Sequence, residues 1–222
     1  MDQKQRTKQL DKLEREGVTF VSRDGVVISE EAILSPGVVI YPGTVVEGAS
    51  VIGGGCILGP NTMLVACRIG VGVRINSSQC YHSEIDDGSH IGPYAHVRPD
   101  CKIGKNVKIG AYVEIKNSAI GDGTSLAHLC YVGDCDVGED VNFGCGVVTA
   151  NYDGKQKYRS TIGDNAFIGC NTNIISPVKI GNNAYIAAGS NIDRDVPEGS
   201  LAIGRERPNI KEGWSDRFFN RK

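Results

Sequence analysis

The chain has 222 residues, which is enough for one large domain or two small ones with a buried core. Aromatic residues make up only 6% of it, against 29 glycines, which argues against a core rich in Phe and Trp and favours many tight turns around a narrow aliphatic interior. The formal net charge of -2 gives no electrostatic reason to expect nucleic acid or an anionic membrane surface as a partner.

The eight cysteines bear on the cellular compartment. None belongs to a Cys-x-x-Cys pair, and most occupy positions of a repeat where small apolar residues are expected. The first residues, MDQKQRTKQL, do not form a secretory signal peptide. We therefore expect reduced thiols in a cytoplasmic protein. No apolar run approaches the roughly 18 residues that a membrane-spanning helix needs.

The first segment, residues 1–20, predicts a linker-type helix. Residues 1–16 are highly charged with alternating sign, and Leu10 and Leu13 are their main apolar positions. Gly17 is well placed to end a helix, because glycine adopts the left-handed conformation at low cost. A short surface helix is the favoured interpretation, and a disordered leader is the alternative.

From Val27 onward an aliphatic residue recurs about every six positions, which fits neither an α-helix nor a simple strand alternation. Many of these residues are followed by Gly, as in IGPYAH, IGKNVK, IGAYVE and IGNNAY. The series, with short phase shifts, is Val27, Ile33, Val39, Val45, Val51, Ile57, Met63, Ile69, Ile75, Ile85, Ile91, Val97, Ile103, Ile109, Ile115, Ile120, Leu126, Tyr131, Val137, Phe143, Ile162, Ile168, Ile174, Ile180, Ile186 and Ile192.

This hexapeptide pattern resembles the left-handed parallel β-helix, an all-β fold in which three hexads form a triangular coil and the aliphatic residue points inward. The handedness follows from the resemblance alone, because parallel crossovers are usually right-handed. About 165 residues at roughly 18 per coil would give about nine coils. We expect the β-helix over residues 21–195. The segment 196–222 should leave the repeat as a C-terminal tail that crosses onto a neighbouring subunit.

The longest break in the repeat lies between Thr149 and Ile162, where ANYDGKQKYRS is polar and carries a turn at Asp153–Gly154. A loop extruded from a rigid solenoid is a common way to build a site, and a harmless surface insertion is the alternative. His128 lies on the same run of coils. A lone histidine is more often structural or solvated than catalytic, but neutral imidazole suits the role of a general base near neutral pH.

The stretch HLCYVGDCDVGEDVNFGCG followed by TANYDGKQK is similar to the acetyltransferase domain of the bacterial N-acetylglucosamine-1-phosphate uridyltransferase/glucosamine-1-phosphate acetyltransferase family. GPYAHVRP, VEIKNSAIGDG, AYIAAGS, DVPEGSLAIGR and KEGW match in the same order, strongly over residues 85–214. The resemblance implies acetyl transfer from acetyl-CoA to the amine of glucosamine 1-phosphate, without a metal, by a homotrimer whose site is shared between chains. The family's uridyltransferase domain has no counterpart here, so we expect no uridylyl transfer.

By this resemblance His128 is the general base that takes the proton from the attacking amine. Arg98 in HVRP and Lys116 in EIKN match the cations that hold the sugar phosphate, a role that suits fixed positive charge; solvated surface charges are the alternative. Contacts with the sugar are implied at Tyr131 and Asn142. Contacts with acetyl-CoA are implied at Cys145, Asn151, Tyr152, Lys157, Cys170, Ala188 and Arg205. At Cys145 and Cys170 the family typically has Ala and Ser, and both replacements are small.

Several alternatives remain open at this point. The acceptor can be another amino sugar or a hydroxyl. Covalent catalysis through an acyl-cysteine at Cys130, Cys145 or Cys170 is a further possibility. A zinc site like that of γ-type carbonic anhydrases needs three histidines, and the spacing of His82, His90, His96 and His128 does not match that family. A non-catalytic scaffold is the remaining class, and the polar loop argues against it.

Overall fold

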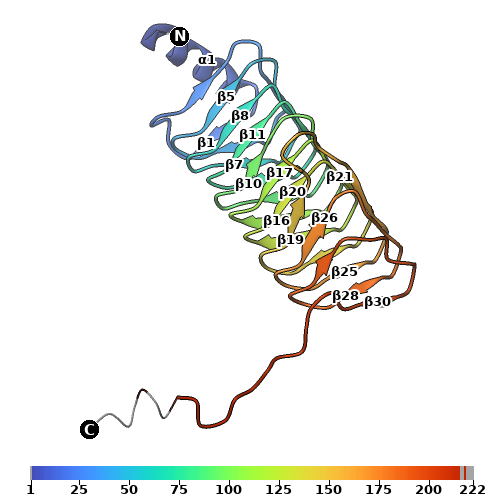
Figure 1. Ribbon diagram of the computed structural model, residues 1–222. Coiled ribbons are helices and arrows are strands. Elements are labelled where there is room, and N and C mark those ends of the chain that lie inside the picture. Colours follow the sequence, from blue (N-terminus) through green and yellow to red (C-terminus); the bar gives the residue numbers. More distant parts are fainter. Residues whose placement is uncertain (1, 216–217, 219–222) are drawn as a thin grey trace.

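The structure, a computed structural model, describes residues 2–215 and residue 218. One helix precedes a prism of short parallel strands, and an extended segment follows the prism (Figure 1). The strands stack coil upon coil into three sheets, one for each face of the prism. The predicted parallel β-helix is thus confirmed, with 11, 10 and 9 strands in its sheets where the repeat had suggested about nine coils.

Every strand is short, and every pairing between successive coils is parallel. Sheet A consists, in stacking order, of β1 (Thr19–Phe20), β4 (Val39–Ile40), β7 (Ile57–Leu58), β10 (Arg74–Ile75), β13 (His90–Ile91), β16 (Lys108–Ala111), β19 (Ser125–His128), β22 (Asn142–Phe143), β25 (Phe167–Ile168), β28 (Tyr185–Ile186) and β30 (Leu201–Ala202). Sheet B consists of β2 (Val27–Ile28), β5 (Val45–Glu47), β8 (Met63–Val65), β11 (Gln79–Tyr81), β14 (His96–Val97), β17 (Glu114–Lys116), β20 (Tyr131–Gly133), β23 (Val148–Ala150), β26 (Asn173–Ile175) and β29 (Asn191–Ile192). Sheet C consists of β3 (Ile33–Leu34), β6 (Val51–Ile52), β9 (Arg68–Ile69), β12 (Glu84–Ile85), β15 (Lys102–Ile103), β18 (Ala119–Ile120), β21 (Cys135–Val137), β24 (Ser160–Ile162) and β27 (Lys179–Ile180).

The N-terminal helix forms where the sequence predicted it, as α1 (Gln3–Arg15). Asp2 caps its first turn through a capping box, which satisfies backbone N–H groups that have no partner inside the helix. Leu10 and Leu13 are each only 2% exposed and join the hydrophobic core. Gly17 follows the helix with a φ of 93°, the left-handed conformation that ends many helices. Within the described residues, no helix is long and apolar enough to cross a membrane.

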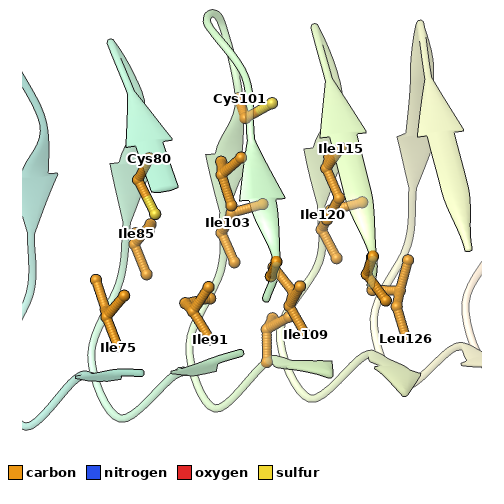
Figure 2. Packing of buried hydrophobic residues seen from close by; sticks show 14 of the residues in the cluster. Ile75, Cys80, Ile85, Ile91, Cys101, Ile103, Ile109, Ile115, Ile120 and Leu126 are labelled. Atoms are coloured by element: carbon orange, nitrogen blue, oxygen red, sulfur yellow. The ribbon is translucent and has the colours of Figure 1, made fainter. Parts of the chain in front are cut away.

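The core is a set of aliphatic columns that run the length of the prism. Figure 2 shows Ile75, Ile91, Ile109 and Leu126 from successive coils of sheet A stacked in one such row. Each is at most 2% exposed. Burial of this kind grows with each added coil, at roughly 25 cal/mol per Å² of apolar surface.

A second, smaller residue faces inward two positions before each of these aliphatic residues. Cys101 precedes Ile103 in this way, and both are buried. Where the small residue is polar, its hydroxyl is satisfied by backbone, as when Ser83 donates to the carbonyl of Arg98 at 2.9 Å and accepts from the amide of Cys101 at 3.1 Å. The eight cysteines are all free thiols; five of them fill such small inward positions, and Cys80 stands in an aliphatic position, in line with Leu64 and Val97.

The phase predicted for the first coils was wrong by one residue. Val27, Ile33, Val39, Val45, Val51, Ile57 and Met63 face outward, and the core is lined instead by Ile28, Leu34, Ile40, Val46, Ile52, Leu58 and Leu64. Two apolar residues stand side by side in each of these strands, so the spacing alone does not tell which one points inward. The corner at Ala66 is one residue shorter, and from Ile69 onward the predicted residues face inward. The same error recurs at Tyr131, because Val132 is the buried residue there.

The polar loop is an insertion at one corner of an otherwise regular stack. In β21 and β24, Cys135 pairs with Ser160, which lies 25 residues later. In the preceding coil Ala119 pairs with Asp136, only 17 residues later. The extra residues bulge outward while the core continues without interruption.

Stacking also continues somewhat beyond residue 195. Val196 forms a parallel bridge with Ile180, and β30 (Leu201–Ala202) pairs with β28. Gly204 still donates its N–H to the hydroxyl of Ser190 at 3.1 Å. After this point the chain runs away from the prism (Figure 1).

The corrected phase can be tested with two adjacent residues of β3. Leu34 is 6% exposed and Ile33 is 63% exposed. We expect Leu34→Ala to lower the free energy of unfolding by about 2–5 kcal/mol, because it leaves a cavity in a packed core. Ile33→Ala should change it by less than about 0.5 kcal/mol. Urea denaturation of both variants measures the difference, and equal losses would contradict the assigned phase.

Candidate functional site

Four of the seven residues predicted for acetyl-CoA, Cys145, Cys170, Ala188 and Arg205, form a column on the edge where sheet A turns into sheet B (the A–B edge), whereas Asn151, Tyr152 and Lys157 lie on the other side of sheet B. His128 ends β19, and its carbonyl accepts the N–H of Gly146 at 3.2 Å. One coil further, the carbonyl of Cys145 accepts the N–H of Asn171 at 2.8 Å. Backbone hydrogen bonds thus hold successive coils of this edge in register, as they do the sheets.

The column continues to the C-terminal end of the prism. The carbonyl of Cys170 accepts the N–H of Gly189 at 2.7 Å. Arg205 then donates from Nε to the carbonyl of Ala188 at 2.8 Å. The structure therefore brings His128, Cys145, Cys170, Ala188 and Arg205 onto one edge in chain order.

His128 is accessible from solvent. Its residue is exposed, and it pairs with Ala111 at the end of two longer strands, β16 and β19. Within the described part of the chain its side chain has no hydrogen-bond partner. An imidazole with both nitrogens open is free to meet a substrate amine.

The residues predicted for the sugar phosphate lie mainly on sheet B, toward the edge where sheet B turns into sheet C (the B–C edge). Arg98 pairs with Glu114 at 2.9 Å. Lys116, at the end of β17, pairs with Asp134 at 3.5 Å, and its side chain is 19% exposed. Both cations are thus already neutralised in part by a carboxylate of the same chain, which their isolated positions in the sequence did not indicate.

Tyr131 and Asn151 lie with Arg98 and Lys116 near the B–C edge, and we call these four residues the second group. A Cβ atom on Gly133 would lie 2.4 Å from the hydroxyl of Tyr131 and 2.9 Å from Nδ2 of Asn151. Only glycine leaves room there for both side chains. Asn151 is buried, and its amide donates to the carboxylate of Asp134.

The inserted loop brings a third cation to this group. A bridge between Tyr152 and Lys157 makes the loop a small hairpin, and the Asp153 carboxylate accepts the N–H groups of Lys155 and Gln156 at 2.7 and 2.8 Å. Tyr152 is 58% exposed.

The electrostatics show how closely these cations gather. The closeness of Lys116, with a smaller effect from the charge of Arg98, lowers the pKa of Lys157. Contact with the Lys157 amine, followed by the negative charge of Asp134, raises the pKa of Lys116. Three basic groups held together attract an anion, and a phosphate monoester is the natural match.

Asn142 lies neither in the column on the A–B edge nor in the second group near the B–C edge. It is exposed on β22, where it pairs with Ser125 and Phe167 on the outer face of sheet A. It lies shortly before Cys145 in the same coil, on the approach to the A–B edge.

Two polar residues beside the second group were not predicted, Asp134 and Asn117. Asp134 is only 6% exposed, and Asn117 also donates its amide to the Asp134 carboxylate. In the sequence Asp134 looks like any other corner aspartate. Asp100 and Asp140 share its left-handed backbone but are exposed. Burial, which the repeat alone does not reveal, is what distinguishes it.

Two grooves on the surface of the described chain lie away from the predicted residues. One surface groove lies against sheet C and is lined in part by Arg68, Glu84 and Lys102. Another lies near Lys179 and Asp195 at the C-terminal end. Neither groove contains any of the predicted site residues.

The geometry gives little support to a zinc site built from histidines or to covalent catalysis by Cys130. Within residues 2–215 and 218, no three His, Cys, Asp or Glu side chains are grouped to hold a metal ion. Burial raises the pKa of the Cys130 thiol and raises the pKa of Cys135 to about 12. A nucleophilic cysteine needs its thiolate, so Cys130 is poorly suited to covalent catalysis.

The difference in burial between the cysteines can be tested through the reactivity of their thiols. Cys170 is exposed and Cys130 is buried. We expect brief treatment of the native protein with iodoacetamide at neutral pH to alkylate Cys170 well before Cys130 or Cys135. Peptide mass spectrometry measures the order, with the urea-unfolded chain as the control in which all thiols react. Alkylation of Cys130 as fast as Cys170 would contradict the assignment.

Comparison with known proteins agrees with this architecture. The family model for bacterial transferase hexapeptide (six repeats) matches residues 82–117 and 159–194. The bifunctional protein GlmU of Clostridium botulinum is 54% identical over 106 residues, which cover 48% of this chain and 23% of that protein. GlmU of Acetivibrio thermocellus is 55% identical over 103 residues, 46% of this chain and 22% of that protein. The matched part thus spans less than a quarter of these curated relatives.

A solved structure extends the likeness to most of the prism. The UDP-N-acetylglucosamine acyltransferase of Francisella novicida superposes with a TM-score of 0.53 over 84% of this chain and 67% of that chain. Its sequence identity is 20%, so this likeness concerns the fold alone. Two segments of this left-handed parallel β-helix therefore match bacterial transferase hexapeptide repeats, and about half of the chain is similar to a part of the bifunctional GlmU proteins.

Proposed function

We propose that the chain is an N-acetyltransferase that moves the acetyl group of acetyl-CoA to the amine of glucosamine 1-phosphate. The observation that carries this proposal is the gathering of Arg98, Lys116 and Lys157 on one side of sheet B, with the open imidazole of His128 on its other side. The similarity to proteins named GlmU over about half the chain supports the same reading. The product, N-acetylglucosamine 1-phosphate, would serve UDP-N-acetylglucosamine and cell-wall precursor synthesis.

In this proposal the amine of the sugar attacks the thioester carbonyl carbon. Neutral His128 accepts the proton that the amine loses as the new C–N bond forms. The C–S bond then breaks, and the CoA sulfur leaves and recovers a proton. A thioester is already an activated acyl donor, so these steps require no metal. Holding the two reactants together supplies much of the rate enhancement.

The acceptor would be held mainly through its phosphate. Arg98 and Lys116 would stay beside their carboxylate partners, Glu114 and Asp134, and offer their remaining N–H donors to the dianion, and Lys157 would add a third contact. Tyr131 and Asn142 offer a hydroxyl and an amide to the ring hydroxyls.

The donor would lie along the A–B edge. Coils rise by about 4.8 Å, so the column from Cys145 through Cys170 to Ala188 suits an extended pantetheine arm. Arg205 at the end of this column is placed for a CoA phosphate. Asn151 and Tyr152 would contact acetyl-CoA from the inserted loop.

We further propose that the active particle is a homotrimer with sites shared between chains. The two groups of residues lie at opposite edges of sheet B, and the two grooves described above contain none of them. The segment after Arg205 leaves the prism with Ile210 80% exposed and Trp214 49% exposed, which favours its packing on a neighbour. We expect the reaction to run in the cytoplasm, where eight free thiols remain reduced.

Thiol release from acetyl-CoA tests the reaction. We expect release with glucosamine 1-phosphate and much less with glucosamine or UDP-glucosamine, because three cations suit a phosphate monoester. His128→Ala should lower kcat by about 100- to 10,000-fold, the usual worth of a general base. A fully active His128→Ala variant would contradict the mechanism. A preference for another amine or for a hydroxyl acceptor would show that glucosamine 1-phosphate is not the substrate.

The oligomeric state is tested separately by gel filtration with light scattering. We expect a particle of about three chains, each of 23.7 kDa. The activity should fall on dilution below the concentration at which the particle dissociates. A stable, fully active monomer would overturn the shared site.

A further inference from the structure

Asp134 has the backbone of a corner residue but not the surroundings of one. Its φ of 50° is the left-handed conformation that Asp and Asn adopt at the corners of the prism. Asp100 lies on the same B–C edge with a φ of 64° and is exposed, whereas Asp134 is 6% exposed. Corner geometry explains the choice of aspartate but not its burial. A buried carboxylate is retained only where its charge and lone pairs are matched.

The side chain of Asp134 meets three polar groups from two coils: Lys116 and Asn117 from one, and Asn151 from the other. Oδ1 accepts from the amide of Asn117, and Oδ2 accepts from the amide of Asn151. Lys116 approaches Oδ2 at 3.5 Å. One carboxylate therefore contacts both a cation proposed for the sugar phosphate and a residue proposed for acetyl-CoA.

The backbone of Asp134 adds a second connection to the loop. Its N–H donates to the carbonyl of Lys116 at 3.0 Å, and its carbonyl accepts the N–H of Ser160 at 3.1 Å. Asn151 and Ser160 bracket the inserted loop 151–159. Asp134 thus holds the beginning of the loop with its side chain and the residue after its end with its main chain.

We propose that Asp134 is a positioning residue that fixes Lys116 and the base of loop 151–159 in one arrangement, so that a single buried carboxylate sets the acceptor and donor parts of the site relative to each other. This inference rests on the function proposed above. It assigns Asp134 no contact with substrate: it acts through Lys116 and Asn151.

The charge of Asp134 matters as much as its shape. Burial raises the pKa of this carboxyl, but hydrogen bonds from Asn117 and Asn151 and the charge of Lys116 outweigh that effect and keep the pKa below its ordinary value. The group is therefore ionised at neutral pH. Its negative charge acts on both lysines: it raises the pKa of Lys116 and opposes the lowering of the pKa of Lys157 by the neighbouring cations.

Asp134→Asn is the sharpest test, because asparagine has the same shape and tolerates the left-handed backbone. Its side chain places an NH2 donor where one carboxylate oxygen now accepts, so it sets a donor against the amide of Asn117 or of Asn151. We expect the KM for both substrates to rise and kcat/KM to fall by about 100-fold, since small displacements of binding groups have such effects. Asp134→Ala should behave similarly, and if it does not fold, Asp134→Asn still decides the test.

The pH dependence of kcat/KM shows whether Asp134→Asn acts by removing a charge beside Lys116 or by a general loss of structure. Without the carboxylate, Lys116 loses its proton at lower pH than in the unmodified protein. The alkaline limb of kcat/KM for glucosamine 1-phosphate should therefore move to lower pH in Asp134→Asn. Asp100→Asn is the matched control, because it makes the same change at an exposed corner of the same edge, and it should leave both the profile and kcat/KM unchanged.

A second measurement does not depend on activity. Trypsin cleaves after Lys155 and Lys157 in the exposed loop, and Asp134→Asn should speed this cleavage severalfold in the native protein while Asp100→Asn does not. If the unmodified protein releases no CoA with glucosamine 1-phosphate, the proposed function fails, and the cleavage rates alone decide whether Asp134 holds the loop. An Asp134→Asn variant that matches Asp100→Asn in kinetics, pH profile and cleavage would overturn the inference.

Discussion

The structure depends on one packing constraint, the stacking of identical short coils along a single axis. On each of its three faces, a coil contributes one aliphatic and one smaller side chain to the core. Its backbone N–H groups donate to the carbonyl groups of the next coil. A coil has no stability without its neighbours, because its apolar face would remain in water. The position of every outward side chain is therefore determined by the register of the coils beneath it.

This constraint leaves chemistry few places to reside. Inward positions are filled with apolar or self-satisfied side chains, so polar groups gather on outer faces, at corners or in insertions. His128 stands at the end of a strand on the A–B edge, and Lys116 at the end of a strand on sheet B. The loop 151–159 is an insertion that lengthens one corner without disturbing the core, and it too can carry polar groups. The rigid prism then holds these separate groups at fixed distances.

The buried carboxylate of Asp134 shows how such a surface is tied together. Flat sheets offer no walls to orient long side chains such as lysine, and free rotation of these chains weakens binding. A single group that accepts from Asn117 and Asn151 and pairs with Lys116 restricts three side chains at once. The clustering of Lys116 and Lys157 depends on it, because two adjacent ammonium groups repel each other unless a negative charge lies nearby.

The candidates His128, Arg98 and Lys116 followed from the resemblance to a known family. The sequence itself shows the repeat, the helix that ends before Gly17 and the place of the insertion, because a period of six and a polar interruption are visible in one dimension. It did not determine the phase of the first coils, where paired apolar residues such as Ile33 and Leu34 are equivalent in spacing but not in burial. Nor did it single out Asp134 from Asp100, since both occupy the same kind of corner. Only the tertiary structure decided these points, because burial and partnership depend on which coils lie above and below a residue.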